Sequence, residues 1–156
     1  MREVIMVGLV VASHGRLADE LVTTAEQIVG KLSAVATCNI EPGTSLEDLR
    51  AKMRRAVAEV DQGEGVIVMA DLFGGTPCKE SMMMCSERCQ GLLEVLAGVN
   101  LPMLLKANSL RSEAMPLAEM AAQLASHGQR NITCASALLR EAQQRQQQQQ
   151  QAASRT

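Results

Sequence analysis

Histidine is scarce in this 156-residue chain, and the position of one of its two histidines, His14, indicates chemistry. His14 follows the apolar run Val4–Ala12 and precedes Gly15, so its ring is expected at the end of a buried strand, close to a helix start. An imidazole is a nucleophile and an acid–base group near neutral pH, and helix N-termini favour anions. A phosphoryl group on His14 would therefore lie in a favourable field. The alternative interpretation is a loop histidine that only packs or forms hydrogen bonds.

Asp71 is the second candidate, because it also follows an apolar run, Gly65–Ala70. A carboxylate that binds one imidazole nitrogen fixes the tautomer, leaves the other nitrogen free to attack and stabilises the ring when it becomes cationic. The alternative is an ordinary turn or helix-capping aspartate. The turn formed by Gly74, Gly75 and Thr76 comes next and offers backbone N–H groups and a hydroxyl to phosphate oxygens. It lacks the Gly-Lys-Ser/Thr ending of a Walker A loop, so nucleotide hydrolysis is not indicated.

Strand and helix patterns alternate along the chain and are expected to position these residues. Four apolar runs have the length and composition of buried parallel strands. They are Val4–Ala12, Val35–Ile40, Gly65–Ala70 and Leu92–Ala97. Helical spacing follows each run, with a stop at Gly30, a capping-box pattern at Ser45 and Asp48, and Pro77 in a first helical turn.

The second half of the chain continues this alternation. Helices are expected from Pro102 to Asn108 and from Pro116 to Ser126, and a last short strand over Asn131–Ala135. The whole order predicts an α/β fold, doubly wound, with a mainly parallel four-stranded sheet and helices on both faces. In such a sheet the functional crevice lies at the carboxyl ends of the strands, where the strand order reverses. For the order 2-1-3-4 that point lies between the strands that end near His14 and Asp71; spacing alone does not fix this order.

The composition argues against several classes of protein. The formal net charge is −2 and Phe73 is the one aromatic residue, so nucleic-acid binding is not indicated. No apolar run approaches the length of a membrane span, and the N-terminal run leads directly into His14, as a core strand would, rather than a signal peptide. His127 is expected at a helix C-terminus, where a cation is stabilising without any function.

Five cysteines, an odd number, form no recognisable disulfide framework and favour a reducing, cytoplasmic location. Cys78, Cys85 and Cys89 share one face of a predicted helix, where a thiol serves as a small apolar group. Zinc binding by these three is disfavoured, because no fourth ligand is evident. Cys38 and Cys134 lie in strand-like runs and are expected in the core.

The C-terminal segment differs in kind from the rest of the chain. It consists mainly of glutamine, alanine, serine and arginine, with an unbroken run from Gln146 to Gln151. Such a segment buries too little apolar surface to offset the entropy lost on ordering. We therefore expect one domain over residues 1–141 and a disordered Gln-rich tail over residues 142–156.

Three motifs, in the same order and spacing, resemble a known family. They are Val10–Gly15, Asp71–Pro77 and Ala97–Met103. The chain resembles the enzyme IIA domain of the mannose-type (mannose/fructose/sorbose) bacterial phosphotransferase system. The resemblance implies a phosphocarrier that accepts a phosphoryl group on His14 from the phosphocarrier protein HPr and passes it to a IIB component during sugar uptake. It also implies that Asp71 orients this histidine, that Gly74, Gly75 and Thr76 hold the phosphoryl group, and that no metal or other cofactor takes part.

The resemblance further implies a fold and partners. Family members have a four-stranded parallel sheet and are often homodimers that exchange a C-terminal strand, for which Asn131–Ala135 is the candidate. Contact with the membrane is expected only through a permease complex. Leu72 and Phe73 are candidate docking residues for partner proteins. The chain departs from many members at Lys79, where they have asparagine, which bears on docking or on the helix start.

Two alternatives use the same residues. One is a regulatory module in which the phosphorylation state of His14 controls binding to a regulator or kinase. The other is the related phosphoryl-donor subunit of dihydroxyacetone kinase, against which the element Gly98–Pro102 and the absence of fused carrier domains argue. A non-catalytic binding domain is the remaining option.

Overall fold

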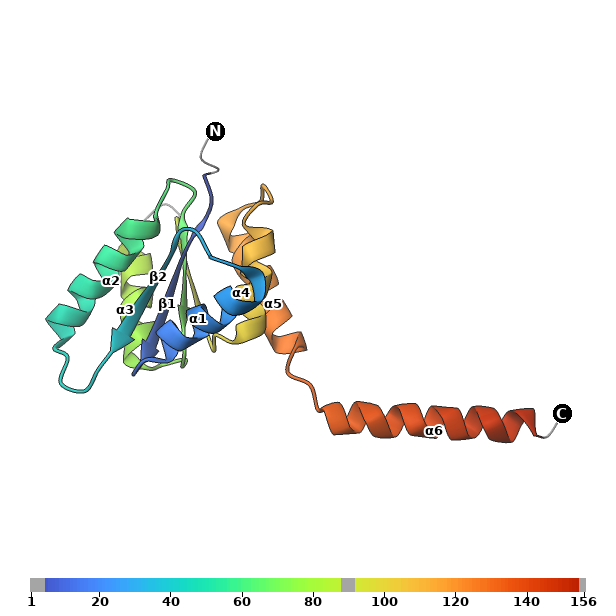
Figure 1. Cartoon of the computed structure of the whole chain (residues 1–156). Coiled ribbons are helices and arrows are strands. Elements are labelled where there is room, and N and C mark those ends of the chain that lie inside the picture. The colour runs from blue at the N-terminus through green and yellow to red at the C-terminus, as the bar shows by residue number, and fades with distance from the viewer. Residues whose placement is uncertain (1–4, 88–91, 155–156) are drawn as a thin grey trace.

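The computed structural model describes residues 5–87 and 92–154, which form a parallel sheet between two layers of helices, with one further helix that projects from them (Figure 1). The strands are β1 (Gly8–His14), β2 (Val35–Ile40), β3 (Val66–Ala70) and β4 (Leu93–Ala97). Their order in the sheet is β2-β1-β3-β4, and every neighbouring pair is parallel. The order 2-1-3-4 is therefore confirmed, and β1 lies between β2 and β3.

The strand bounds agree with the predicted runs except at the first strand. β2 has the predicted bounds, and β3 and β4 each begin one residue later than predicted. β1 begins at Gly8 and continues through His14, which places the histidine on the strand itself. Val4, where the predicted run begins, lies outside the described residues. At Gly8 the backbone of α2 comes so close that an added Cβ would stand 2.5 Å from the carbonyl oxygen of Val60.

Helices cover both faces of the sheet. They are α1 (Leu17–Val29), α2 (Leu46–Val60), α3 (Thr76–Glu87), α4 (Leu101–Leu110), α5 (Leu117–Arg130) and α6 (Ala135–Ala153). Helices α1, α4 and α5 pack on one face, and α2 and α3 on the other (Figure 1). β1 contributes side chains to the core on both faces of the sheet, because successive side chains of a strand point to opposite faces. Leu9 and Val11 pack with the first layer, and Val10 and Ala12 with the second.

Local signals at the helix ends are confirmed. Gly30 follows α1 with φ 83°, a conformation that glycine adopts without strain, and its N–H donates to the Glu26 carbonyl. The Ser45 hydroxyl accepts from the backbone N–H of Asp48 at 3.0 Å and donates to the Asp48 carboxylate at 2.8 Å. The predicted N-cap at Ser45 is thus confirmed, while the Asp48 carboxylate accepts from the Ser45 hydroxyl and not from its backbone N–H as in a full capping box.

The expected strand over Asn131–Ala135 does not form within the single chain, and its exchange with a second copy stays a prediction. Residue 131 is in a turn, residues 132–134 pair with no strand of the described chain, and Ala135 begins α6. A strand needs a neighbouring ladder, and the sheet of this chain provides none at that point. The disordered tail expected over residues 142–156 also differs from the structure, in which residues 142–153 continue α6. Alanine and glutamine favour helix, but α6 has no buried residue and projects away from the sheet (Figure 1).

The cysteine predictions are confirmed in part. Cys38 and Cys78 are buried and Cys85 is half-buried, with its thiol 3.0 Å from the Leu93 carbonyl oxygen. Cys89 lies outside the described residues. Cys134 is exposed, so the expectation that it is in the core is wrong, because it precedes the projecting helix α6. No helix in the described part of the chain is both long and apolar enough to cross a membrane.

Candidate functional site

His14 stands at the carboxyl end of β1, where the chain leaves the sheet. Its side chain is 50% exposed, although the six residues before it in β1 are buried. Gly15 follows with φ 55°, and its N–H donates to the Ile40 carbonyl of β2 at 2.8 Å. This turn ends the strand at once and leaves the imidazole at the edge of the sheet.

Asp71 follows β3 and meets His14 directly. Its N–H donates to the Ala12 carbonyl at 3.1 Å, which continues the β1–β3 ladder by one bond. Its carboxylate oxygen Oδ2 accepts from the His14 backbone N–H at 2.9 Å and lies 3.0 Å from the ring nitrogen Nδ1. The Asp71 side chain is only 12% exposed, and its other oxygen, Oδ1, is buried with no partner in the described chain.

The contact with Asp71 decides which ring nitrogen is free. An ionised carboxylate accepts hydrogen bonds and donates none, so Nδ1 of His14 must carry the proton of the contact. The lone pair of the neutral ring is then on Nε2. A nucleophile with an oriented ring and a free nitrogen is the arrangement that group transfer on histidine needs.

The backbone of the turn at Gly74 and Gly75 lies directly against the His14 ring. Gly74 has φ 78°, and the Gly75 N–H donates to the Leu72 carbonyl at 3.2 Å, which closes the turn. A Cβ on Gly75 would stand 3.0 Å from Cε1 of His14. Only a residue without a side chain lets the backbone come this close to the imidazole.

Helix α3 starts immediately after Gly75. Thr76 is its first residue and is exposed, and the first bond of the helix runs from the Lys79 N–H to the Gly75 carbonyl at 3.0 Å. The N–H groups of a first turn have no partner within the helix, and the helix dipole adds positive potential there. Hydrogen-bond donors therefore lie next to the histidine ring.

The predicted docking residues extend from the same turn into solvent. Leu72 is 59% exposed and Phe73 is 78% exposed. Contiguous exposed apolar side chains are a feature of surfaces that other molecules cover. His127 lies apart from this cluster, in the last turn of α5, as predicted for a helix-terminal cation.

Several residues that shape this edge were not singled out in the sequence. The Ser13 hydroxyl is buried and accepts from the Ala18 N–H at 2.7 Å, which ties the start of α1 to the residue before His14. The Ala70 carbonyl accepts from both Gly98 and Val99, which holds the loop after β4 beside Asp71. The Ser13 contact spans five residues and matches no common capping spacing, so sequence gives no signal for it.

The described residues contain no cluster of three or more His, Cys, Asp or Glu side chains that could hold a metal ion.

The sequence comparisons define the class of protein. Residues 8–125 match the family model EIIA-man, described as "PTS system fructose IIA component". This span is most of the chain, and the chain belongs to this family of phosphotransferase-system IIA components. A four-stranded parallel sheet of order 2-1-3-4 is the fold shared with its solved relatives.

Named relatives include several enzyme II components. The chain is 29% identical over 126 residues to the PTS system mannose-specific EIIAB component of Escherichia coli K12, and this match covers 81% of the chain but only 38% of that protein. It is 26% identical over 131 residues to the PTS system fructose-specific EIIA component of Bacillus subtilis, with 84% of the chain and 88% of that protein covered.

Two solved structures show the same architecture. A phosphotransferase-system EIIA component from Streptococcus agalactiae superposes with a TM-score of 0.78 at 26% identity and covers 85% of this chain and 99% of its own. The mannose/sorbose-specific IIA subunit from Enterococcus faecalis superposes with a TM-score of 0.72 at 35% identity, with 81% of this chain and 92% of its own covered. The resemblance inferred from the three motifs is confirmed.

Proposed function

We propose that this chain is a phosphocarrier in which His14 accepts a phosphoryl group from phospho-HPr on Nε2 and passes it to a IIB component during sugar uptake. The contact of 3.0 Å between His14 Nδ1 and Asp71 Oδ2 supports this most directly, because it leaves Nε2 as the free nucleophile. The membership of the EIIA family and the relatives named for mannose and fructose systems support the same role. Such a carrier works in the cytoplasm and meets the membrane only through a permease complex.

Each transfer exchanges one P–N bond for another. The Nε2 lone pair of His14 attacks the phosphorus of the donor phosphohistidine in line, and the donor nitrogen leaves with the electrons of the broken bond. Nδ1 of His14 keeps its proton throughout. The Asp71 carboxylate holds that proton and offsets the positive charge that develops on the ring. Transfer to the IIB component reverses these steps at the acceptor, so neither a metal nor a nucleotide is needed in this scheme.

The glycine turn is proposed to bind the phosphoryl oxygens. Gly75 supplies the close backbone approach to the ring, and Gly74 and Thr76 lie on either side of it. The exposed Thr76 hydroxyl and the unpaired N–H groups at the start of α3 are donors of the kind that phosphate oxygens accept from. Leu72 and Phe73 would then contact the partner proteins while the two phosphoryl-bearing groups are in line.

Labelling with phosphoenolpyruvate, enzyme I and HPr tests this function. Intact mass should show one acid-labile phosphoryl group, and peptide mapping should place it on His14. NMR correlation of the ring nitrogens should assign it to Nε2. His14→Ala should abolish labelling with a change in unfolding free energy of less than about 1 kcal/mol, since the side chain is half exposed. His127→Ala is the matched control and should be labelled as the wild type is. No label with an active HPr, or a label on His127, would contradict the proposal.

We also propose that residues 1–141 form the functional domain and that the protein is a homodimer. Residues 1–141 should accept the phosphoryl group as the full chain does, because no residue of α6 is buried. A homodimer is also proposed, and sedimentation velocity of the full chain and of residues 1–141 measures it directly. A truncated chain that folds but is no longer labelled would show that the tail belongs to the functional unit.

A further inference from the structure

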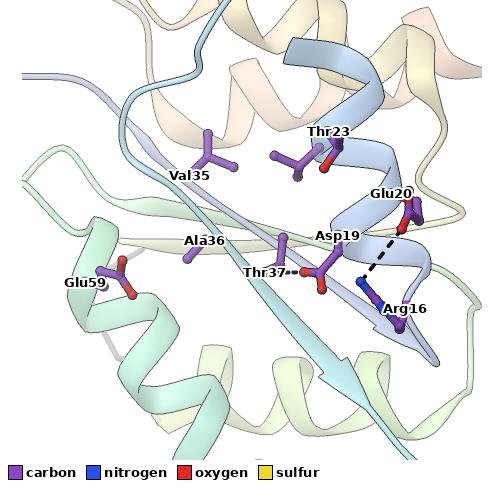
Figure 2. A pocket seen from close by; sticks show the side chains of 9 residues that line it. Arg16, Asp19, Glu20, Thr23, Val35, Ala36, Thr37 and Glu59 are labelled. Carbon is purple, nitrogen blue, oxygen red and sulfur yellow. Dashed lines mark hydrogen bonds and ion pairs between the residues drawn. The ribbon is translucent and has the colours of Figure 1, made fainter. Parts of the chain in front are cut away.

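A groove with a volume of about 550 Å³ runs along the outer side of β2, away from the ring of His14. Helix α1 forms one wall with Arg16, Asp19 and Glu20, and α2 contributes Glu59 to the other (Figure 2). Residues 35–37 of β2 form the floor between the two helices. The groove is therefore built from three elements of the fold, and its floor is a strand.

The floor is an unpaired sheet edge. β2 is the terminal strand of the sheet and, within residues 5–87 and 92–154, pairs only with β1. The Leu9 N–H donates to the Ala34 carbonyl and the Gly15 N–H to the Ile40 carbonyl, so the even-numbered residues of β2 turn their backbone groups toward β1. By the same alternation the backbone groups of Val35, Thr37 and Asn39 face the open edge. An open edge of this kind is a template for one more strand.

The side chains of the groove are predominantly acidic. Three carboxylates, from Asp19, Glu20 and Glu59, stand against one guanidinium, that of Arg16. Arg16 lies 3.9 Å from Glu20. The Glu59 side chain forms no hydrogen bond or ion pair with any other residue that the structure describes. A cationic ligand would thus find uncompensated negative charge here.

The acidic wall is held in place against the strand. Thr37 Oγ1 donates to one oxygen of Asp19 at 2.5 Å, and Asn39 Nδ2 donates to the other at 2.6 Å (Figure 2 shows the first of these bonds). Both side chains belong to the residues whose backbone faces the open edge. The charge of Asp19 is therefore fixed beside the free hydrogen-bonding groups of the strand, and the two features belong to one surface.

We propose that this groove binds an extended, basic segment of a partner protein, which adds to β2 as a fifth strand. Main-chain hydrogen bonds to Val35, Thr37 and Asn39 would supply the affinity. Alternate side chains of an added strand point to opposite faces, so basic residues on one face approach Asp19 and Glu20 and those on the other approach Glu59. A second copy of this chain fits less well, because pairing β2 with β2 would bring two acidic grooves together. The proposal does not depend on phosphorylation of His14.

NMR of the full-length, 15N-labelled protein tests this with a peptide of defined chemistry. The probe is an end-blocked octapeptide that repeats Val-Val-Arg-Arg, which places arginine on both faces of the added strand, and the control peptide replaces arginine with glutamate. The arginine peptide should shift the amide signals of Val35, Thr37 and Asn39 and protect them from hydrogen exchange. The amides of Ala36 and Cys38, which already face β1, should keep their exchange rates. No protection of the three outward amides, or equal protection by the glutamate peptide, would overturn the proposal.

Charge reversal on the walls provides the second measurement. Glu20→Lys and Glu59→Lys should each weaken binding of the arginine peptide by about tenfold or more at low salt. Glu113→Lys, an equal change of charge in the turn between α4 and α5, should leave the affinity as it is. If all three variants bound alike, or if the outward amides became protected on raising the protein concentration without peptide, the basic-segment proposal would be wrong.

Discussion

One oxygen of Asp71 contacts His14 twice. Oδ2 accepts from the His14 backbone N–H at 2.9 Å and lies 3.0 Å from Nδ1 of the same residue, across 57 positions of sequence. The backbone bond fixes where the side chain starts, and the ring contact fixes how the imidazole is turned. A single carboxylate thereby sets both the position and the tautomer of the proposed nucleophile.

Asp71→Asn should slow phosphorylation of His14 by on the order of 10- to 100-fold, by analogy with carboxylates that orient metal-bound histidines. The amide keeps the size of the side chain but removes the negative charge that offsets the cationic ring. Rapid-quench labelling by phospho-HPr measures the rate, and peptide mapping should still find the label on His14. A variant labelled at the wild-type rate would refute the assigned role of Asp71.

Gly75→Ala should impair transfer because of the space that it fills. The new Cβ would stand 3.0 Å from Cε1 of His14, so the ring or the turn must move by a few tenths of an ångström. We expect slower labelling with the unfolding midpoint in urea nearly unchanged. Gly63→Ala is the control: it strains a residue with φ 101° in open space, which precedes β3 whereas Asp71 follows it, and should lower stability without changing the labelling rate.

Arg111 is a buried cation with a structural role, and its removal should destabilise the fold. Its guanidinium donates through Nη1 to the carbonyls of Val7, Ser33 and Ala34 at 3.2, 2.7 and 3.3 Å. Burial lowers the pKa of this guanidinium. Arg111→Ala would remove this donor from the Val7 and Ser33 carbonyls, while the Ala34 carbonyl would keep the Leu9 N–H, so the unfolding free energy should fall by about 1–3 kcal/mol.

Chemical denaturation measures this loss, and Arg55→Ala is the control. Arg55 is exposed on α2, and its replacement should change the unfolding free energy by less than about 0.5 kcal/mol. If Arg111→Ala were as stable as Arg55→Ala, the three carbonyl contacts would contribute nothing to stability.

Cys134 should be the most reactive thiol among the four cysteines that the structure describes. The pKa of its thiol is lowered mainly by a hydrogen bond with the Ser136 side chain and to a smaller extent by one with the Ala137 backbone. Burial raises the pKa of the Cys38 thiol. Alkylation requires the thiolate, so Cys134 should reach half of its maximal rate at a lower pH than an ordinary cysteine. Site-resolved mass spectrometry over a pH series measures this. Ser136→Ala should move the midpoint upward; an unchanged midpoint would show that the hydroxyl has no influence.

Features that depend on neighbours in the chain could be predicted from the sequence. The bounds of β2, the cap at Ser45 and the stop at Gly30 follow from periodicity and from contacts within a few residues. His14 could be singled out in the same way, because an apolar run that ends in histidine and glycine is itself a local pattern. The alternation of strands and helices predicted the α/β class for the same reason.

The sites of long-range contact were decided only by the tertiary structure. That Asp71 meets His14 depends on β3 lying beside β1, and spacing along the sequence does not fix this strand order. The burial of Arg111 among three carbonyls gives no sequence signal, because its partners lie 77 to 104 positions away.

The C-terminal segment shows the same division. Residues 131–135 have strand-like composition, but a strand exists only where another strand offers its ladder, and in this structure none does. Composition and spacing thus determined which residues could act and which elements would form. The packing of the sheet decided which of those residues meet, because hydrogen bonds between distant segments exist only after the strands have taken their order.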